Sequence, residues 1–498
     1  MAFVVWAGAA IAQSPAAVDA EQNHRNMMDQ LGIRTLRPGP SGDEAAPKHA
    51  NYDEALANPY PDLPDPLLTR TGGRVTSSVQ WRTIRRPELL AALEHEIYGK
   101  APSAPPKVTW TVVASEHEQL GFPGVSVLVR QMVGHVDNAT DPAISVDIRM
   151  TVVTPDKGRG PAPLLIMFAR DGFPAPTSPS RQEVERIDAA LKASAVAQDG
   201  SLRAVFAAHP GFTLASEAPF HLPQKNADGD PMPPEQLAAA GWAFALLDPT
   251  SIQADNGAGL TRGIIGLVNK GQPRRPDDWG ALRAWQWGAS RAFDQLAADP
   301  AIDPKAIGVE GVSRYGKAAL VTMAFDQRFA MALVGSSGKG GATPLRRNWG
   351  EDISNLATGE DYWFAGRLLT YDAAQATFGR RTPGDLTVDS NALIALCAPR
   401  LTFISYGVPE QGDAKWLDHR GSWMATVSAS EVWDLLGAKG LNVARDYHAA
   451  PMPAVNQGLL DGQLAWRQHD GGHTDAPNMK WFIQWVDRQV GHSPPQAY

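Results

Sequence analysis

Cysteine is almost absent from this chain of 498 residues, since Cys397 is its only one. A single cysteine excludes an internal disulfide, so an apolar core must stabilise the fold. No cluster of cysteines suggests structural zinc, and we expect neither a metal nor another cofactor.

Long apolar runs and an excess of basic charge are missing as well. Beyond the first residues, no run approaches the ~18 apolar residues needed to cross a bilayer. The chain has 45 Lys and Arg against 53 Asp and Glu, which gives a formal net charge of −8. We therefore expect no nucleic acid or membrane as a partner, and we expect a monomer.

Residues 1–12 are apolar and end in Ala10-Ile11-Ala12, a small-x-small pattern typical of signal-peptide cleavage. The positive region of a signal peptide is missing, so a truncated start and a buried strand are the alternatives. We interpret the segment as an export signal and expect a periplasmic or secreted bacterial protein.

The composition, 43% apolar and 20% charged, is ordinary for a globular protein. The length allows two domains or one large α/β domain with insertions. Fifteen tryptophans are many for this length. They suit a carbohydrate-stacking surface, but large aromatic side chains lie more often in cores, and we favour the core.

The N-terminal part predicts little regular structure before a first helix. Residues 13–75 are rich in Pro, Ala, Asp and Asn without clear periodicity, which predicts an extended arm or linker. Apolar residues at helical spacing then predict a helix over 88–98. Alternating apolar and polar residues predict three antiparallel strands, at 107–114, 124–133 and 144–154.

The remainder predicts one α/β catalytic domain over 76–490. Apolar runs at 163–169 and 241–247 are typical of buried parallel strands. Residues 173–236 between them are polar and too long for a simple loop, and we interpret them as an insertion over an active site. The later strands and helices alternate, which predicts a doubly wound, mostly parallel sheet with helices on both faces. These are strands at 306–309, 331–335, 401–406 and 442–448, and helices at 278–296, 388–396, 420–437 and 478–490.

Ser313 lies at a sharp turn between the strand at 306–309 and a helix that begins at Arg314. This is the geometry of a nucleophile elbow, which exposes the hydroxyl and offers free N–H groups to an oxyanion. The usual pattern is G-x-S-x-G, but here Tyr315 holds the last position and Gly316 comes one residue later. The alternative is an ordinary strand-to-helix connection with a serine as N-cap.

A serine nucleophile needs a histidine base, and His473 in H-D-G-G-H-T-D follows the last strand. Elbow-type hydrolases have the chain order Ser, acid, His, which fits this position. Gly471 and Gly472 would let the loop bring the imidazole to Ser313. His469 in the same loop is a competitor, and a solvated loop histidine is the plainer alternative.

The acid that orients the base should follow the next-to-last strand. The loop after 401–406 reads G-V-P-E-Q-G-D-A-K-W-L-D. Asp413 is the leading candidate, with Glu410 and Asp418 as alternatives. Each of them could also cap a helix or lie in solvent.

The elbow G-V-S-R-Y-G-K resembles that of glucuronoyl esterases, carbohydrate esterase family 15. The resemblance implies an α/β-hydrolase fold and hydrolysis, through an acyl-enzyme, of the ester between 4-O-methyl-glucuronic acid on xylan and lignin alcohols. Further segments resemble landmarks of that family in the same order, over about residues 80–490. They are R-R-P-E-L-L (85–90), I-Y-G-K-A-P (97–102), W-G-A-L-R-A-W-Q-W-G (279–288), F-D-Q-R-F-A (325–330), S-S-G-K-G-G-A (336–342), R-R-N-W-G-E (346–351) and I-A-L-C-A-P-R-L (394–401).

The resemblance implies roles for single residues. Ser313 matches the nucleophile and His473 the base. Arg314 falls where a family arginine helps to stabilise the oxyanion, and Lys317 where a lysine contacts the uronate ring. Both cations suit an acidic sugar better than a neutral acyl group, although Lys317 could also be a solvated helix residue.

Two further positions resemble the sugar site of the family. Glu351 matches an acidic residue that binds sugar hydroxyls. Trp416 resembles a tryptophan of that site, with a spacing one residue longer than usual.

The sequence departs from the family at the catalytic acid. Many members carry it as the glutamate of E-S-G-x-G-G, and here that position is Ser336, which cannot orient an imidazolium by charge. Some bacterial members of the family look as though they use instead an aspartate after the strand that corresponds to 401–406, and Asp413 fits that position. Val312 replaces the family's cysteine, which is consistent with a chain that forms no disulfide there.

Two other functions are compatible with these residues. One is a different xylan esterase on the same scaffold, acting on acetyl or feruloyl groups. The other is a non-catalytic carbohydrate-binding protein, because Ser336 removes the usual acid.

Overall fold

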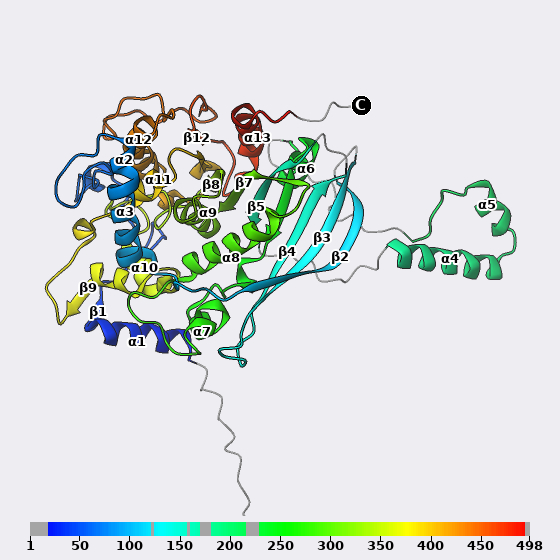
Figure 1. Cartoon of the computed structure of the whole chain (residues 1–498), viewed down its shortest axis with the longest axis horizontal. Helices are drawn as coiled ribbons and strands as arrows, with labels where there is room; N and C mark the ends of the chain where they lie inside the picture. Colours follow the sequence, from blue (N-terminus) through cyan, green and yellow to red (C-terminus); the bar gives the residue numbers. More distant parts are fainter. Residues whose placement is uncertain (1–17, 121–123, 157–159, 170–180, 216–228, 494–498) are drawn as a thin grey trace, which may run out of the picture.

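A ten-stranded sheet runs through the middle of the computed structural model, which describes residues 18–120, 124–156, 160–169, 181–215 and 229–493 (Figure 1). The expected export signal at 1–12 lies outside the described residues. In sheet order the strands are β11 (Gly458–Leu459), β12 (Leu464–Gln468), β10 (Leu401–Tyr406), β8 (Met331–Gly335), β7 (Ile302–Val312), β5 (Ala162–Phe168), β6 (Ala243–Leu247), β4 (Asp147–Pro155), β3 (Val125–Val136) and β2 (Val108–Leu120).

The central strands, from β12 to β6, are parallel to one another. β4, β3 and β2 extend the sheet as an antiparallel meander, and the short β11 is antiparallel at the other edge. Every residue of β5, β8 and β10 is buried, as the continuous apolar runs predicted. The predicted α/β class with a mostly parallel sheet is confirmed.

Helices cover both faces of the sheet and enclose two apolar cores (Figure 1). The larger core lies against α8 (Ala281–Leu296), α9 (Arg314–Phe325), α11 (Ser390–Ala395) and α12 (His419–Leu435). The smaller core lies under α6 (Pro233–Ala239) and α13 (Ala476–Val490). Eight of the fifteen tryptophans are less than 2% exposed, so most of this large aromatic content fills the core. Shorter helices are α2 (Ser78–Gln80), α3 (Arg86–Leu93), α7 (Gly263–Val268) and α10 (Ile353–Gly359).

The N-terminal segment packs on the domain, in contrast to the expected extended arm. Helix α1 (Ala20–Leu31) is followed by β1 (Ile33–Leu36), which pairs antiparallel with β9 (Ala373–Ala376). Met27 and Ile33 are buried in the small core that this pairing forms. The sequence did not predict α1, because its apolar residues are few and gain their burial only against distant segments.

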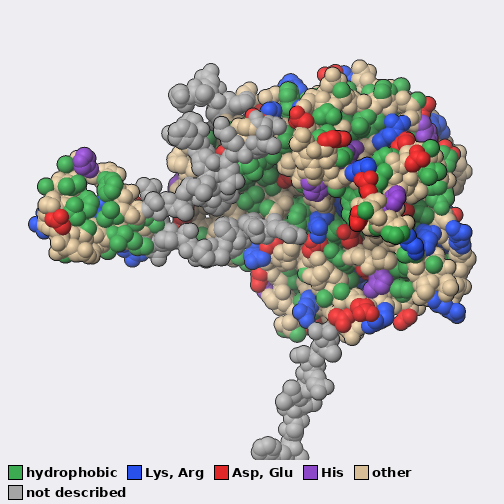
Figure 2. Space-filling model, turned by 180° about the vertical axis from the view of Figure 1, so that it is seen from behind, with side chains coloured by type: hydrophobic (Ala, Val, Ile, Leu, Met, Phe, Trp, Pro, Cys, Tyr) green, Lys and Arg blue, Asp and Glu red, His purple; other side chains and the backbone are tan. Residues whose placement is uncertain are grey.

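The region interpreted as an insertion contains two helices, α4 (Arg181–Gln198) and α5 (Leu202–Ala208). Both stand away from the body of the domain, beyond the β2 edge of the sheet (Figure 1). Figure 2 shows apolar side chains on these helices, and Ile187, Leu191 and Val205 are each more than two-fifths exposed. Helix α6, which lies further along the chain, packs on the sheet. The helices α4 and α5 therefore do not cover the central strands, and residues 170–180 and 216–228 lie outside the described residues.

One predicted strand is wrong. Residues 442–448 form bends and turns, and the last long strand is instead β12, which the sequence analysis did not predict. β12 reads L-A-W-R-Q, and its polar end obscures the apolar pattern. The structure buries that end because Arg467 bonds to Asn478, and Gln468 bonds to the carbonyl oxygen of Gly407 at 2.8 Å. In the described part of the chain, no helix has the length and apolarity to cross a membrane.

Candidate active site

The carboxyl ends of β7, β8, β10 and β12 meet at one edge of the sheet, because these strands are parallel neighbours. Ser313 follows β7, Asp413 lies in the loop after β10, and His473 lies in the loop after β12. The fold therefore gathers at one edge the three residues that the sequence separated by 160 positions.

Ser313 has the strained backbone of a nucleophile elbow, with φ 63° and ψ −128°. A residue with a Cβ adopts positive φ only where the surrounding structure holds it. The N–H of Ser313 donates to the carbonyl oxygen of Gly335 at 2.9 Å. A Cβ at Gly316 would collide with that same carbonyl, whereas Tyr315 stacks edge-on against Trp285. This turn therefore requires glycine at position 316 and accommodates a tyrosine at 315, where the usual G-x-S-x-G pattern has its last glycine.

Asp413 is 2% exposed and is surrounded by hydrogen-bond donors. Its Oδ1 lies 2.7 Å from Nδ1 of His473. Its Oδ2 accepts from Oγ of Ser336 at 2.8 Å and from the N–H of Gly407 at 2.9 Å, and it lies 3.3 Å from Nε2 of His419. Burial alone would raise the pKa of Asp413, but the hydrogen bonds from His419 and His473 hold it well below the ordinary value. The carboxylate is therefore ionised beside the imidazole.

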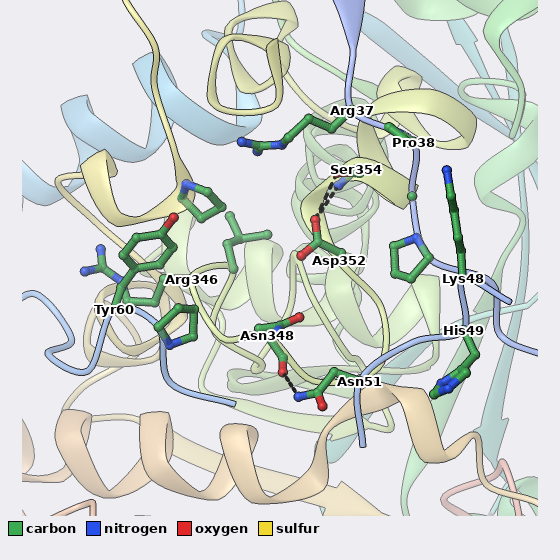
Figure 3. Close-up of a pocket in the computed structure, with 15 residues that line it drawn as sticks. Arg37, Pro38, Lys48, His49, Asn51, Tyr60, Arg346, Asn348, Asp352 and Ser354 are labelled. Carbon is green, nitrogen blue, oxygen red and sulfur yellow. Dashed lines mark hydrogen bonds between the residues drawn. The ribbon is translucent and has the colours of Figure 1, made fainter. Parts of the chain in front are cut away.

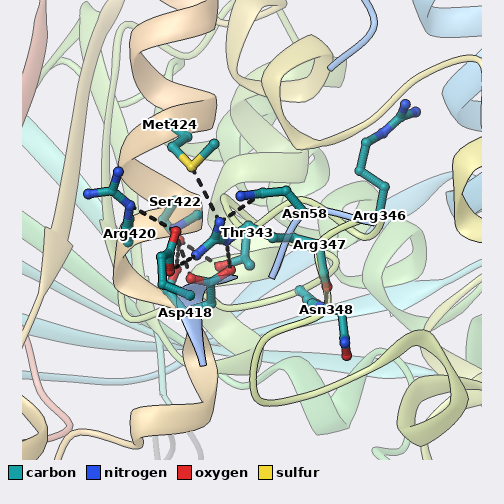
Figure 4. A network of polar contacts seen from close by, with 12 residues as sticks. Asn58, Thr343, Arg346, Arg347, Asn348, Asp418, Arg420, Ser422 and Met424 are labelled. Carbon is teal, nitrogen blue, oxygen red and sulfur yellow. Dashed lines mark hydrogen bonds and ion pairs between the residues drawn. The ribbon is translucent and has the colours of Figure 1, made fainter. Parts of the chain in front are cut away.

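The other candidate acids lie elsewhere. Glu410 is exposed on a short turn, Pro409–Gln411. Asp418 is buried in an ion pair with Arg347 at 2.6 Å, and it also caps α12 by accepting from the N–H of Gly421 (Figure 4). Asp418 thus stabilises the start of a helix.

His469 is also held by its surroundings. Its ring nitrogens lie 2.8 Å from the carbonyl oxygen of Thr474 and 3.0 Å from the backbone nitrogen of Gly471, so the buried imidazole braces the loop from inside. Among the two histidines of this loop, His473 is the one that reaches Asp413.

Arg314 is anchored by residues that the sequence analysis did not single out. Its Nη1 donates to Oδ2 of Asp255 at 2.7 Å, and the guanidinium lies 5.2 Å from the ring centroid of Trp363. Oδ1 of Asp255 accepts from Nε1 of Trp363 at 2.8 Å and from the hydroxyl of Tyr362 at 3.1 Å. One carboxylate therefore sets the position of both the guanidinium of Arg314 and the ring of Trp363.

Lys317 is 3% exposed, so it is not a solvated helix residue. Its ammonium lies 5.4 Å from the ring centroid of Trp363 and close enough to Glu351 to oppose the rise in pKa that burial causes there. Burial and the charge of Glu351 raise the pKa of Glu360 to about 7. One oxygen of each glutamate, Oε2, is buried without a hydrogen-bond partner among the described residues. Buried, unpaired acceptors beside a lysine suit the hydroxyl groups of a sugar.

Trp416 lies beside Glu351, because its carbonyl oxygen accepts the N–H of Glu351 at 3.0 Å. Its indole is partly buried and lies close to Gly42 of the N-terminal segment, where an added Cβ would be 3.2 Å from the ring. Glu360, Trp363 and Asp255 carried no motif, and only their proximity to Arg314 and Lys317 identifies them.

A pocket of about 490 Å³ opens between the N-terminal segment and residues 345–354 (Figure 3). Two of its basic side chains are already paired, Arg37 with Asp372 and Arg346 with Asp389. The pocket contains none of the three residues that meet at the sheet edge.

Comparisons with known proteins agree on one family. A family model described as "Glucuronyl esterase, fungi" matches residues 274–437. The chain is 28% identical over 450 residues to carbohydrate esterase MZ0003 from an unknown prokaryotic organism, covering 90% of this chain and 93% of that protein. It is 33% identical over 169 residues to a 4-O-methyl-glucuronoyl methylesterase from Podospora anserina, covering 32% of this chain and 33% of that protein.

A solved structure extends the similarity over nearly the whole chain. The CE15 glucuronoyl esterase from Teredinibacter turnerae T7901 is 36% identical, with a TM-score of 0.76. The alignment covers 95% of this chain and all of that one.

We predict that Gly316→Ala disrupts the elbow, because its Cβ meets the carbonyl oxygen of Gly335. Overpacking of this kind costs about 1–3 kcal/mol. Thermal unfolding should show a lower Tm than wild type, together with a loss of turnover. Gly359→Ala is the matched control, since a Cβ there meets nothing within 4 Å. Equal Tm values for the two variants would contradict the tight elbow.

Proposed function

Because the chain belongs to the glucuronoyl esterases of carbohydrate esterase family 15, we propose that it hydrolyses 4-O-methyl-glucuronoyl esters that link xylan to lignin alcohols. Ser313, His473 and Asp413 would form the catalytic triad. The observation that carries this proposal is the 2.7 Å contact between His473 and a buried, ionised Asp413, at the sheet edge that also holds the strained Ser313.

The first half of the reaction forms an acyl-enzyme. His473 takes the proton of the Ser313 hydroxyl as its oxygen attacks the ester carbonyl. The backbone N–H of Arg314, with its guanidinium, stabilises the negative charge on the carbonyl oxygen of the tetrahedral intermediate. The imidazolium of His473 then protonates the departing alcohol oxygen, and the C–O bond of the ester breaks.

The second half repeats these steps with water. His473 removes a proton from water, whose oxygen attacks the acyl carbon, and Ser313 leaves with the proton that His473 returns. Asp413 stabilises each imidazolium by charge and holds the tautomer that leaves Nε2 facing the serine. The uronic acid is released as a carboxylate.

Recognition of the sugar rests on the groups around Trp363. Lys317 supplies a buried cation, and Glu351 and Glu360 supply acceptors for ring hydroxyls. Trp363 and Trp416 offer apolar ring faces. An acetyl or feruloyl esterase needs no such set of charged groups, which favours a uronate. The position of Asp413 supports a catalytic function over a non-catalytic one, because this carboxylate lies 2.7 Å from the proposed base although Ser336 stands where a glutamate is expected. Export is part of this proposal, since the substrate lies outside the cell.

We predict that the protein hydrolyses benzyl glucuronate and leaves acetylated xylan and feruloyl esters nearly unchanged. The rates at which benzyl alcohol and acetate are released, measured by chromatography, compare the substrates directly. Ser313→Ala should lose turnover of benzyl glucuronate. Faster release of acetate by the wild type would assign the protein to the acetyl esterases, and activity retained by Ser313→Ala would remove the proposed nucleophile.

We predict that Asp413→Ala lowers kcat by a factor of ~10⁴, as loss of the orienting carboxylate does in a serine-protease triad. The kcat of Glu410→Ala should stay within about twofold of the wild-type value, because the side chain of Glu410 is exposed to solvent. Steady-state kinetics on benzyl glucuronate separates the two variants. The opposite ranking would move the acid to Glu410.

We predict that KM for benzyl glucuronate falls as the pH rises through about 7. Burial raises the pKa of Glu360 to about 7, and the ionised carboxylate accepts stronger hydrogen bonds from sugar hydroxyl groups than the protonated form does. Glu360→Gln should flatten the KM profile and leave the pH dependence of kcat unchanged. A KM profile that is the same in both proteins would exclude Glu360 from sugar binding.

A further inference from the structure

Two buried carboxyl groups outside the proposed triad flank its nucleophile and its base in the sequence. Glu310 lies in β7 three residues before Ser313, and Asp475 lies two residues after His473. Glu310 is 5% exposed and Asp475 is 4% exposed. Buried carboxylates are normally paired with a cation, because an unpaired buried charge is costly. Among the described residues, neither of these two forms an ion pair with a basic side chain.

The two side chains meet in the apolar layer between the sheet and α13. Glu310 is in register with Met167 of β5 and Leu333 of β8, and both belong to the core under α13. Asp475 is the residue that precedes α13. The two carboxyl groups lie close enough to interact, and among the described residues Oδ2 of Asp475 is buried without a hydrogen-bond partner.

A hydrogen bond between two carboxyl groups requires one proton, since two carboxylates have no hydrogen to share. Burial raises the pKa of both groups, and the charge of Asp475 raises that of Glu310 further. Other titratable groups on the elements packed here have their own partners, and Glu235 of α6 is one more buried carboxyl group among them. These are His469 with the carbonyl of Thr474, His473 with Asp413, Arg467 with Asn478, and Lys480 with Asp230.

The contact joins the base loop to the nucleophile strand. The loop is tied to the acid's segment by the N–H of Val408, which donates to Gly471 at 3.0 Å, and it is braced internally by His469. Asp475 adds the tie to β7. Its Cβ also lies where a Cβ added at Gly335 would meet it at 3.2 Å, and Gly335 is the residue whose carbonyl oxygen accepts the N–H of Ser313.

We propose that Glu310 and Asp475 share one proton, and that this carboxyl–carboxylate hydrogen bond positions the His473 loop against the strand that carries Ser313. The pair touches no substrate and acts only by positioning. Its effect on turnover rests on the proposed esterase function, whereas the shared proton does not.

The shared proton would make the fold sensitive to a rise in pH, because burial raises the pKa of both groups. A carboxyl group whose pKa is raised in the folded state contributes stability that is fully present below its unfolded pKa, ~4. That stability is lost as the pH rises through the folded pKa, because the folded state holds more protons than the unfolded state. Deprotonation would place two negative charges together and push the base loop away from β7. We therefore expect kcat, more than KM, to fall at alkaline pH.

Infrared difference spectroscopy tests the shared proton without reference to activity. The spectrum of wild type minus Glu310→Gln at pH 7 should show the carbonyl band of a protonated carboxyl group. The control difference, wild type minus Asp470→Asn, should show none, because Asp470 is an exposed carboxylate in the same loop. A protonated-carboxyl band that is absent from the first difference would overturn the proposal.

Kinetics and unfolding at several pH values test the positioning role. Glu310→Gln keeps a hydrogen-bond donor, so kcat at neutral pH should stay within about threefold, and the alkaline fall of kcat and Tm should weaken. Glu310→Leu fits the apolar layer but breaks the tie, and it should lower kcat about tenfold or more with KM unchanged. If Tm falls with rising pH by the same amount in wild type and in Glu310→Gln, the shared proton is refuted. This outcome can be measured even if Glu310→Leu fails to fold. A wild type without esterase activity would refute the proposed function, and the infrared and Tm measurements would still decide the shared proton.

Discussion

The organisation of the site depends on one buried hydrogen bond, between Oδ1 of Asp413 and Nδ1 of His473. It joins the loop after β10 to the loop after β12 and so sets where the base lies. A carboxylate that is 2% exposed stays ionised only if donors surround it, and Ser336, Gly407 and His419 supply them. The polar groups at this sheet edge therefore serve to keep a single carboxylate charged.

The same carboxylate also binds Ser336, which follows β8 and donates its hydroxyl hydrogen to Oδ2 of Asp413 at 2.8 Å. The ends of β8 and β10 are adjacent in the sheet, so an acid after either strand lies near the loop that holds His473. With the charge placed on Asp413, Ser336 becomes a donor to that charge.

Four carboxyl groups near the site differ in charge because their surroundings differ. Asp413 is held ionised by its donors, whereas burial and the nearby charge of Glu351 raise the pKa of Glu360 to about 7. Glu310 and Asp475 have no cation and meet each other in an apolar layer. One fold thus provides a fixed anion, a group that titrates near neutrality and a proposed shared proton. Each follows from the balance between desolvation and local hydrogen bonds.

Strong local patterns in the sequence determined the α/β class, the buried strands β5 and β8, and the elbow around Ser313, because hydrophobic periodicity and turn residues act over a few positions. Weak patterns failed: residues 442–448 are not a strand, and α1 gains its burial only from distant segments. Chain order proposed Asp413 for the acid, but the fold alone brought it to His473 and enclosed it. Asp255 and Glu360 carry no motif, because a charge acquires its partner and its pKa only when residues far apart in the chain are packed together.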